Sequence, residues 1–284
     1  MIASAPGKII LFGEHSVVYG RHALVSAINL RCRVEVKKGR DFRIISPLGT
    51  TGLDFKVHPY ISFSIKRFCQ FEKIEGVEII VKSDIPIASG LGSSAGVTVA
   101  TLKALSEEFG VNLNDEEIFE IAKKVEIDVQ GRASGIDPFI STFGGTWIFP
   151  EKKRVDLPFQ FFVIRLWERS TKTMVEKVAN LRQKYPDVLE RIFDAIDAIA
   201  LKAPNCKLED FEELIYINQS LLRAIGVSSP EIDEIVSKLE KDGFKVKLTG
   251  AGGGGCLFGI FKDKKPDGSF LVKPEKEGVR IEDS

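Results

Sequence analysis

Cysteine is scarce in this chain and is spread along its whole length. The 284 residues include four cysteines: Cys32, Cys69, Cys206 and Cys256. No two of them form a C-x-x-C pair, and the three histidines lack the spacing of metal ligands. A zinc site or a disulfide framework is therefore not expected, and a reducing compartment such as the cytoplasm is the simpler interpretation.

Long apolar runs and an excess of one charge are also missing. No apolar run reaches the roughly 18 residues of a membrane-spanning helix, and the short run after Lys8 is too brief for a signal peptide. We therefore expect a cytoplasmic protein without a membrane partner. The 40 basic and 40 acidic residues cancel, which argues against a general nucleic-acid binder. Asparagine and glutamine are few beside lysine, arginine and glutamate, as is typical of thermophiles.

What the chain does have is the composition of a globular protein. Hydrophobic residues make up 44% and charged residues 28% of a chain long enough for two domains. The composition changes after Trp147–Pro150, which predicts an N-terminal domain at 1–153 and a C-terminal domain at 154–284. Strand and helix patterns occur in runs without regular βαβ alternation, which indicates the α+β class.

Periodicity and end signals predict the individual elements. Strands are expected at 9–12, 31–36, 77–82 and 161–167, on both sides of a glycine loop within 245–261, and at an edge near 279–281. Helices are expected at 97–109, 115–130, 172–184, 187–202, 208–225 and 230–241. Asn114 and Glu117 have the spacing of a capping box, and Ser229 followed by Pro230 has the pattern of a helix N-terminus.

The stretch GLGSSA, residues 90–95, leads from small residues directly into a helical pattern. It could be a tight strand-to-helix turn, or it could be an anion cradle built from backbone N–H groups and a helix N-terminus. Gly90 and Gly92 would let the backbone approach an anion closely. We expect Ser93 or Ser94 to cap the helix, and a hydroxyl there could also bind magnesium.

Three other segments carry candidate chemistry: APGKIILFGEH (5–15), QGRASGIDP (130–138) and LTGAGGGGC (248–256). None fits a Walker A loop, and the glycines of 90–96 miss the dinucleotide-binding spacing by one residue. The run GAGGGG could be a flexible linker. It lies between two strand patterns within one domain, however, and this favours close approach of a ligand or of another backbone.

Each polar residue in these segments also has a structural interpretation. Lys8 could be a solvated surface lysine, and Asp137 could simply form the turn that Gly-Ile-Asp-Pro favours. Glu126 could lie on the solvated flank of a helix, because it falls off the apolar stripe. His15 could be a structural hydrogen-bonding residue. Spacing alone does not decide between these interpretations and a catalytic site.

The four segments together, in this order, resemble the family of galactokinase, homoserine kinase, mevalonate kinase and phosphomevalonate kinase, the GHMP kinases. The resemblance spans residues 5 to 260, and within the family the segments look most like those of the mevalonate kinases. It implies an N-terminal ribosomal-protein-S5-like domain and a C-terminal ferredoxin-like domain with the active site between them. The implied reaction is ATP- and Mg2+-dependent phosphorylation of the primary hydroxyl of mevalonate in isoprenoid biosynthesis.

The resemblance also implies roles for residues at matching positions. Asp137 matches a catalytic base and Lys8 its cationic partner, while Ser94 and Glu126 match magnesium ligands. The ATP phosphates would lie on Pro86, Gly90, Leu91, Gly92, Ser93, Ser94 and Ala95. The acceptor side would comprise Lys8, His15, Asp137, Thr171, Gly252 and Gly253.

Other functions remain open from the sequence. Phosphomevalonate, or another small alcohol that this family phosphorylates, could be the acceptor. A decarboxylating lyase relative also uses ATP on a similar fold. A ligand-sensing relative without catalysis is disfavoured because Lys8, Ser94, Glu126 and Asp137 are all present. The oligomeric state is left open, with a homodimer as one candidate.

Overall fold

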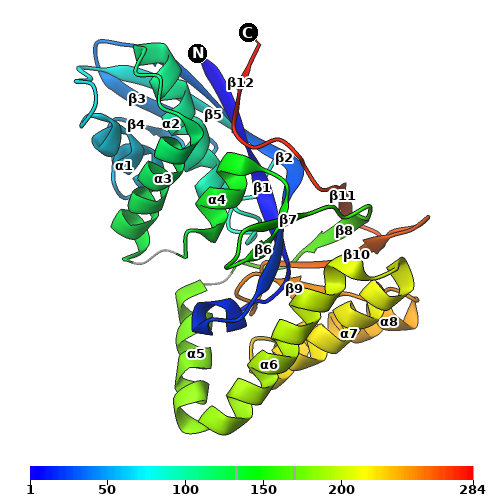
Figure 1. Cartoon of the computed structure of the whole chain (residues 1–284). Coiled ribbons are helices and arrows are strands. Elements are labelled where there is room, and N and C mark those ends of the chain that lie inside the picture. Colours follow the sequence, from blue (N-terminus) through cyan, green and yellow to red (C-terminus); the bar gives the residue numbers. More distant parts are fainter. Residues whose placement is uncertain (132–133, 169–170, 284) are drawn as a thin grey trace.

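The computed structural model describes residues 1–131, 134–168 and 171–283. Two β-sheets, with helices packed against them, form the frame of this part of the chain (Figure 1). The strands of the first sheet are β1 (Ile2–Phe12), β2 (Ala23–Lys38), β3 (Phe42–Ser46), β4 (Gly49–Thr51), β5 (Val77–Ser83), β6 (Thr146–Phe149), β7 (Lys153–Val155) and β12 (Arg280–Glu282). They follow the order β12-β1-β2-β5-β3-β4, with β6 beside β2 and β7 beside β6.

The second sheet is smaller and belongs to the second half of the chain. Its strands are β8 (Gln160–Arg165), β9 (Lys247–Thr249), β10 (Cys256–Phe261) and β11 (Phe270–Val272). Their order is β11-β8-β10-β9, and each neighbouring pair is antiparallel.

Helices cover both sheets. They are α1 (Pro59–Phe68), α2 (Ser93–Phe109), α3 (Asp115–Gln130), α4 (Ile136–Phe143), α5 (Thr171–Lys184), α6 (Pro186–Lys202), α7 (Leu208–Ala224) and α8 (Pro230–Lys241), with the short 3-10 turns η1 (Ser16–Tyr19) and η2 (Ala203–Asn205). The first four pack with the first sheet, and the second four lie together beside the second sheet (Figure 1). This mixture of layers confirms the α+β class.

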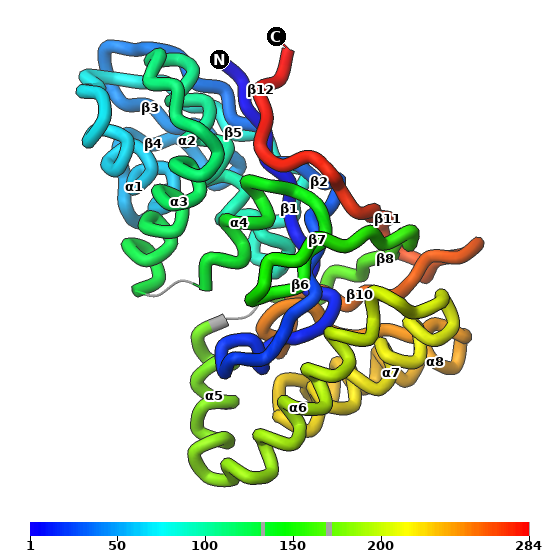
Figure 2. The backbone as a smooth tube through the Cα atoms, in the orientation of Figure 1, coloured from blue at the N-terminus to red at the C-terminus, as the bar shows by residue number. Residues whose placement is uncertain are grey.

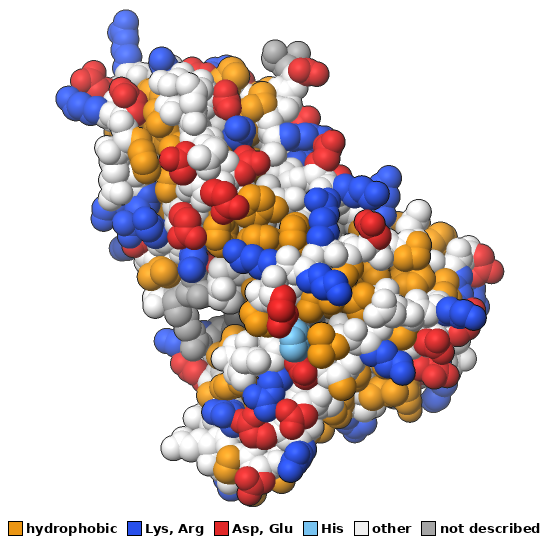
Figure 3. Space-filling model, in the orientation of Figure 1, with side chains coloured by type: hydrophobic (Ala, Val, Ile, Leu, Met, Phe, Trp, Pro, Cys, Tyr) orange, Lys and Arg blue, Asp and Glu red, His pale blue; other side chains and the backbone are white. Residues whose placement is uncertain are grey.

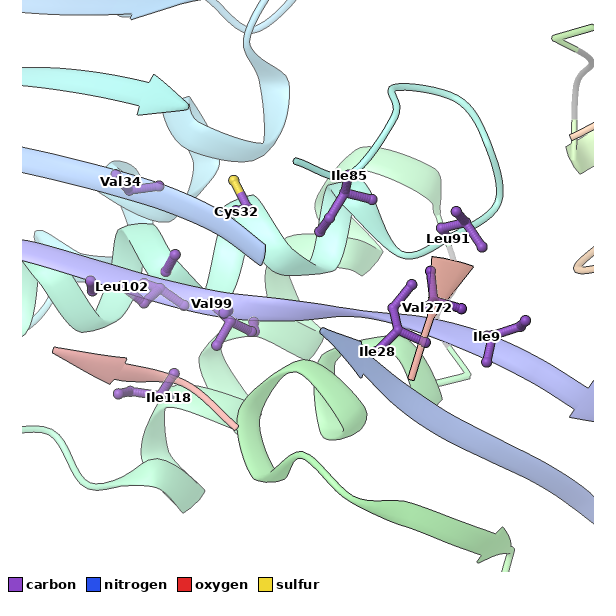
Figure 4. Close-up of a cluster of buried hydrophobic side chains, with 14 of the residues drawn as sticks. Ile9, Ile28, Cys32, Val34, Ile85, Leu91, Val99, Leu102, Ile118 and Val272 are labelled. Atoms are coloured by element: carbon purple, nitrogen blue, oxygen red, sulfur yellow. The ribbon is translucent and has the colours of Figure 1, made fainter. Parts of the chain in front are cut away.

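Strand β1 lies between β12 and β2 in the first sheet and carries Lys8. It begins at Ile2, earlier than the expected start at residue 9, and the pairing with β2 shifts between Pro6 and Gly7. Proline lacks an N–H to donate, so the shift at Pro6 lets the strand continue past it. Ile9 of β1 and Val99 of α2 point into the same apolar core (Figure 4). Lys8, next to this shift, is thereby carried into the interior.

The start of α2 differs from expectation. The N-cap is Gly92, with φ 80°, and no side chain forms the cap. The prediction that Ser93 or Ser94 caps this helix was therefore wrong. The chain enters the helix through a left-handed conformation, which a glycine adopts without the steric cost that a serine has. The N–H groups of the first turn stay available to another acceptor.

Two other helix starts confirm the sequence prediction. The side chain of Asn114 accepts the N–H of Glu117, and the Glu117 carboxylate accepts the N–H of Asn114. Ser229 accepts the N–H of Ile232 at the start of α8. The expected stop of α2 is also present, because Gly110 has the left-handed conformation of a C-cap.

The end of the chain returns to the first sheet. Strand β12 pairs with β1, so the first and last strands run side by side (Figure 2). The buried Arg31 of β2 binds this returning segment, because its guanidinium donates to the carbonyl of Gly278 at 2.5 Å. The proposed division near residue 153 stays a prediction. Whatever its place, β12 belongs to the sheet of the first half.

The surface carries both signs of charge. Figure 3 shows acidic and basic side chains interspersed over the visible face, in keeping with the net charge of zero. Within the residues described, no helix has the length and apolar character needed to cross a membrane.

Candidate active site

A buried lysine and an aspartate form the centre of the candidate site. Lys8 on β1 is 4% exposed, and its Nζ lies 3.3 Å from Oδ1 of Asp137. Asp137 lies in the first turn of α4, where a negative charge is favourable, and not in the open turn that its sequence permits. The hydroxyl of Ser141 donates to the carbonyl of Pro6 at 3.0 Å and ties α4 to β1. A lysine this buried is not the solvated surface residue of the alternative interpretation.

Glu126 on α3 is the second acidic group at this centre. Its Oε2 is buried and has no hydrogen-bond partner among the residues that the structure describes. Burial and then the nearby charge of Asp137 raise the pKa of this carboxyl, Lys8 and the backbone N–H of Gly135 lower it, and the net result is a pKa of about 7. Glu126 is therefore not an ordinary solvated carboxylate. It is a buried carboxyl with a raised pKa, and it interacts electrostatically with both Lys8 and Asp137.

The GLGSSA loop is hydrogen bonded to the backbone of Lys8. The backbone N–H of Lys8 donates to the carbonyl of Leu91 at 2.8 Å, and the Leu91 side chain is fully buried in the core (Figure 4). A Cβ at Gly92 would lie 2.8 Å from Cγ of Lys8. Gly92 thus provides the space that the Lys8 side chain occupies. Leu91 can offer only its backbone to a ligand.

The GAGGGG loop connects β9 to β10 and faces the GLGSSA loop. A Cβ at Gly255 would lie 3.1 Å from the carbonyl oxygen of Ser89, and one at Gly250 would lie 3.8 Å from that of Gly90. The loop is fixed at Gly253, whose N–H donates to the carbonyl of Val227 at 2.7 Å. A flexible linker would not have these contacts. Two glycine loops from different sheets therefore meet at one place.

Side chains also join the two sheets beside this meeting point. The Thr249 hydroxyl accepts the N–H of Ile10 and donates to the Ile10 carbonyl, both at 3.0 Å. His15 Nε2 lies 2.9 Å from the carbonyl oxygen of Ala251 in the GAGGGG loop. Burial lowers the pKa of His15, although the contact with Ala251 opposes this. His15 is therefore neutral at physiological pH and donates through Nε2.

A buried ion pair next to His15 was missed by the sequence analysis. Glu14 and Lys247 are 1% and 0% exposed, and their side chains are hydrogen bonded to each other. Burial raises the pKa of Glu14 and lowers that of Lys247, while their mutual attraction opposes both shifts. The Lys247 ammonium also lies over the rings of Phe12 and Phe258. In the sequence, the one feature that could have indicated this ion pair was the position of Lys247 within a predicted strand.

For the remaining predicted site residues, the described part of the structure gives no direct contact with Lys8 or Asp137. Ser94 is half-buried in the first turn of α2, with the free N–H groups of that helix end. A Cβ at Gly252 would lie 2.6 Å from the Val227 carbonyl oxygen, so Gly252 serves loop packing. The Pro86 carbonyl accepts the Ser89 hydroxyl at 2.7 Å. Thr171 begins α5, but its side chain lies outside the described part of the structure.

The arrangement is suited to transferring a charged group between oxygen atoms. The helix end and the two glycine loops offer backbone N–H groups to an anion. Lys8 supplies a buried positive charge, and Asp137 supplies a carboxylate that can accept a proton. Glu126 supplies a carboxylate with an unused oxygen.

Comparisons with known proteins agree with this geometry. Residues 59–145 match the model of the GHMP kinases N terminal domain, and residues 192–276 match that of the GHMP kinases C terminal domain. A protein of Archaeoglobus fulgidus named mevalonate kinase is 64% identical over the whole of both chains. A mevalonate kinase of Pyrococcus horikoshii is 35% identical, covering all of this chain and 98% of its own.

A solved structure shows the same architecture. The Methanococcus jannaschii mevalonate kinase superposes with a TM-score of 0.82 at 31% identity, covering 100% of this chain and 98% of its own. The two family models together with the full-length relatives decide the assignment, and the chain belongs to the GHMP kinases.

Proposed function

We propose that this chain transfers the γ-phosphoryl group of ATP to the primary hydroxyl of mevalonate, giving 5-phosphomevalonate and ADP. The observation that carries the proposal is the ion pair between the buried Lys8 and the partly exposed Asp137, beside the place where the two glycine loops meet. The choice of mevalonate is supported by the relative at 64% identity. It is also supported by an L. major mevalonate kinase solved with R-mevalonate, which superposes with a TM-score of 0.79 at 26% identity over 92% of this chain and 86% of its own.

The proposed chemistry follows from the positions of Asp137 and Lys8. As the acceptor oxygen bonds to the γ-phosphorus, its proton passes to the Asp137 carboxylate, the bond to the bridging oxygen breaks, and ADP leaves. Lys8 pairs with the Asp137 carboxylate and stabilises the negative charge that develops on the transferring group. Burial strengthens both effects because the site has a low dielectric constant.

The phosphates have a suitable place at the start of α2. Its first-turn N–H groups are uncapped and point out of the positive end of the helix dipole. Gly90 is exposed beside them and brings no side chain into the way of a phosphate. The GAGGGG loop lies opposite, close to the backbone of Ser89 and Gly90.

Glu126 and Ser94 fit a magnesium ion, which would neutralise phosphate charge. A buried carboxylate oxygen without a partner is what a hard cation needs, and a hydroxyl can complete the protein's share of the ligands. Among the described residues there is no cluster of three or more acidic, histidine or cysteine side chains. Magnesium at phosphates commonly uses only one or two carboxylates, so this sparse set is sufficient.

We expect ADP release to require both mevalonate and magnesium. The measurement is a coupled ADP assay with mevalonate, phosphomevalonate, homoserine and galactose at equal concentrations. Turnover with mevalonate should exceed that with the other three. Equal or faster turnover with phosphomevalonate would replace the proposed acceptor, and no turnover with mevalonate would remove it.

Glu126→Gln is expected to raise the magnesium concentration for half-maximal activity by about tenfold, a coupling of ordinary size for one charged ligand. In the unmodified protein this concentration should fall as pH rises through about 7, because the proton and the cation compete for the carboxylate. The variant should lose that pH dependence. Glu120→Gln, an exposed change on the same helix, is the matched control.

The same substitution, which weakens magnesium binding, is expected to stabilise the metal-free protein at high pH. A carboxyl whose pKa is raised by folding favours the folded state below its unfolded value, and this contribution is lost as pH rises through about 7. Glu126→Gln should therefore raise Tm at pH 8 and change it little at pH 5. An unchanged magnesium titration together with an unchanged Tm would make Glu126 an ordinary helix residue.

A further inference from the structure

The connection between β1 and β2, residues 13–22, lies on one face of α6. Glu190, Asp194 and Asp197 are spaced four and three residues apart, so their side chains form a stripe along that helix. Figure 1 shows η1, which belongs to this connection, near α5 and α6. Acidic and basic side chains gather in the corresponding lower part of the molecule (Figure 3).

Two residues of the connection contact the first part of α6, and one of them, Arg21, binds two carboxylates of the stripe. Tyr19 stacks on Phe193, with ring centroids 5.0 Å apart and planes at 12°. Arg21 donates from Nη2 to Glu190 at 2.7 Å and to Asp194 at 2.8 Å. A planar guanidinium fixes orientation through such paired bonds more firmly than a lysine would.

His22 binds the end of the stripe and a second element as well. Its Nδ1 and its backbone nitrogen both contact Oδ1 of Asp197, at 2.7 and 2.6 Å. Its Nε2 lies 2.8 Å from Oε1 of Glu151 in the turn between β6 and β7. We refer to these contacts of Tyr19, Arg21 and His22 as the α6 latch.

The two ring contacts of His22 demand a protonated imidazole. A neutral ring has one N–H and one acceptor nitrogen, so it can donate to only one of the two carboxylates. Only the imidazolium donates to both Asp197 and Glu151. Partial burial acts against the charge, but the hydrogen bonds and charges of Asp197 and Glu151 outweigh it, so the pKa of His22 is raised.

The same connection reaches the candidate active site at its other end. His15 lies at its start and contacts Ala251 of the GAGGGG loop. Close packing leaves this start little freedom, because a Cβ at Gly13 would lie 2.4 Å from Cα of Ala23. The connection is therefore fixed by the glycine loop at one end and by α6 at the other.

We propose that Arg21 and His22 are positioning residues that hold the connection carrying His15 in place through the α6 latch, so that releasing the latch weakens binding of the acceptor alcohol. This inference rests on the proposed function, in which His15 lies on the acceptor side. Phosphate binding depends on other elements, namely α2 and the GLGSSA loop. The latch should accordingly act on the acceptor and not on ATP.

His22→Gln should raise KM for mevalonate about fivefold, the upper range for partly exposed ion pairs, and leave kcat and KM for ATP nearly unchanged. Asp197→Asn should have the same effect, because it removes the negative charge that holds the His22 imidazolium at Asp197. The matched control is His58→Gln, at the far end of the first sheet, where the ring bonds to Ser46 and Thr51. A merely destabilising change would lower Tm without separating the two KM values.

The pH profile gives a second readout. The imidazolium contribution is fully present below the ordinary pKa of 6.5 and is lost as pH rises through the raised value. KM for mevalonate should therefore rise with pH above 6.5 in the unmodified protein and in His58→Gln, and should be high and flat in His22→Gln. The assay uses saturating magnesium, because Glu126 also titrates near pH 7.

Imidazole NMR titration of the free protein separates the latch from the proposed function. Among the three histidines, His22 should titrate above 6.5, and His15 and His58 below it, since burial lowers their pKa values. Asp197→Asn should lower the His22 value. A His22 that titrates at or below 6.5, or a mevalonate KM unchanged in His22→Gln, would overturn the latch. A correct titration without mevalonate turnover would instead reject the proposed acceptor.

Discussion

Asp137→Asn is expected to lower kcat by about 10²-fold or more, the range of general acid–base contributions. Asparagine keeps the shape of the side chain but cannot take the acceptor proton, and it leaves the Lys8 ammonium without the partner that lies 3.3 Å away. The loss belongs to the transition state, so KM for both substrates should change little. Steady-state kinetics with each substrate varied in turn will measure the separation.

Lys8→Met should lower kcat by a similar factor, because it removes the positive charge that pairs with the Asp137 carboxylate. The double variant should be far less impaired than the product of the two single losses, since residues that act as one unit are not additive. A double-mutant cycle on kcat therefore measures the coupling of the pair. Full multiplicativity would mean that Lys8 and Asp137 act independently.

The control for Asp137→Asn is Asp115→Asn. Both aspartates lie in the first turn of a helix, where each interacts favourably with the helix dipole, but Asp115 is exposed and begins α3. Both variants lose this interaction with the dipole, but Asp137→Asn also leaves the buried Lys8 without its charged partner, so its melting temperature should fall further than that of Asp115→Asn. An Asp137→Asn protein with normal kcat and the melting temperature of the control would remove Asp137 from the mechanism.

Gly92→Ala should lower kcat by about 10²-fold, the size that a displacement near 1 Å can have on an oriented group. The new Cβ would lie 2.8 Å from Cγ and 3.2 Å from the backbone nitrogen of Lys8, so the lysine must shift from the position in which it pairs with Asp137. The variant should fold. Its nucleotide affinity should fall less than kcat, because α2 and its first-turn N–H groups remain.

Gly110→Ala is the matched control for this change. Gly110 ends α2 with φ 70°, close to the 80° of Gly92, but a Cβ there would meet no atom within 4 Å. Both variants have the steric cost of a left-handed alanine, about 1 kcal/mol or somewhat more. Equal losses of stability with unequal losses of kcat would isolate the displacement of Lys8. Equal kcat values would show that Gly92 serves only the backbone.

Local signals in the sequence were enough for much of the fold. The side chain of Asn114 and that of Ser229 mark helix starts through bonds to N–H groups three residues away, and such short-range contacts can be predicted from spacing. The start of α2 was not predictable in this way. It depends on the left-handed backbone at Gly92, which follows from the packing of Lys8 against the loop.

Contacts between distant segments left the least trace in the sequence. In the sequence Lys247 is an ordinary lysine in a predicted strand, and its contact with Glu14 is visible only in the structure. His22 is likewise an ordinary loop residue in the sequence, and only the structure shows its contact with Asp197 of α6. The grouping of Lys8, Glu126 and Asp137 came from a family resemblance, since their elements are separated along the chain. The structure supplies what spacing could not, namely burial, the orphaned oxygen of Glu126 and the distances between these groups.

The return of β12 to β1 has a consequence for how the protein is made on the ribosome. Synthesis proceeds from the N-terminus, so the outer edge of β1 at Ile2–Ser4 stays unpaired until Arg280–Glu282 have emerged. An unpaired edge is a template for unwanted association with other chains, and here it persists for nearly the whole time of translation. The first sheet therefore stays incomplete until the second half of the chain has been synthesised.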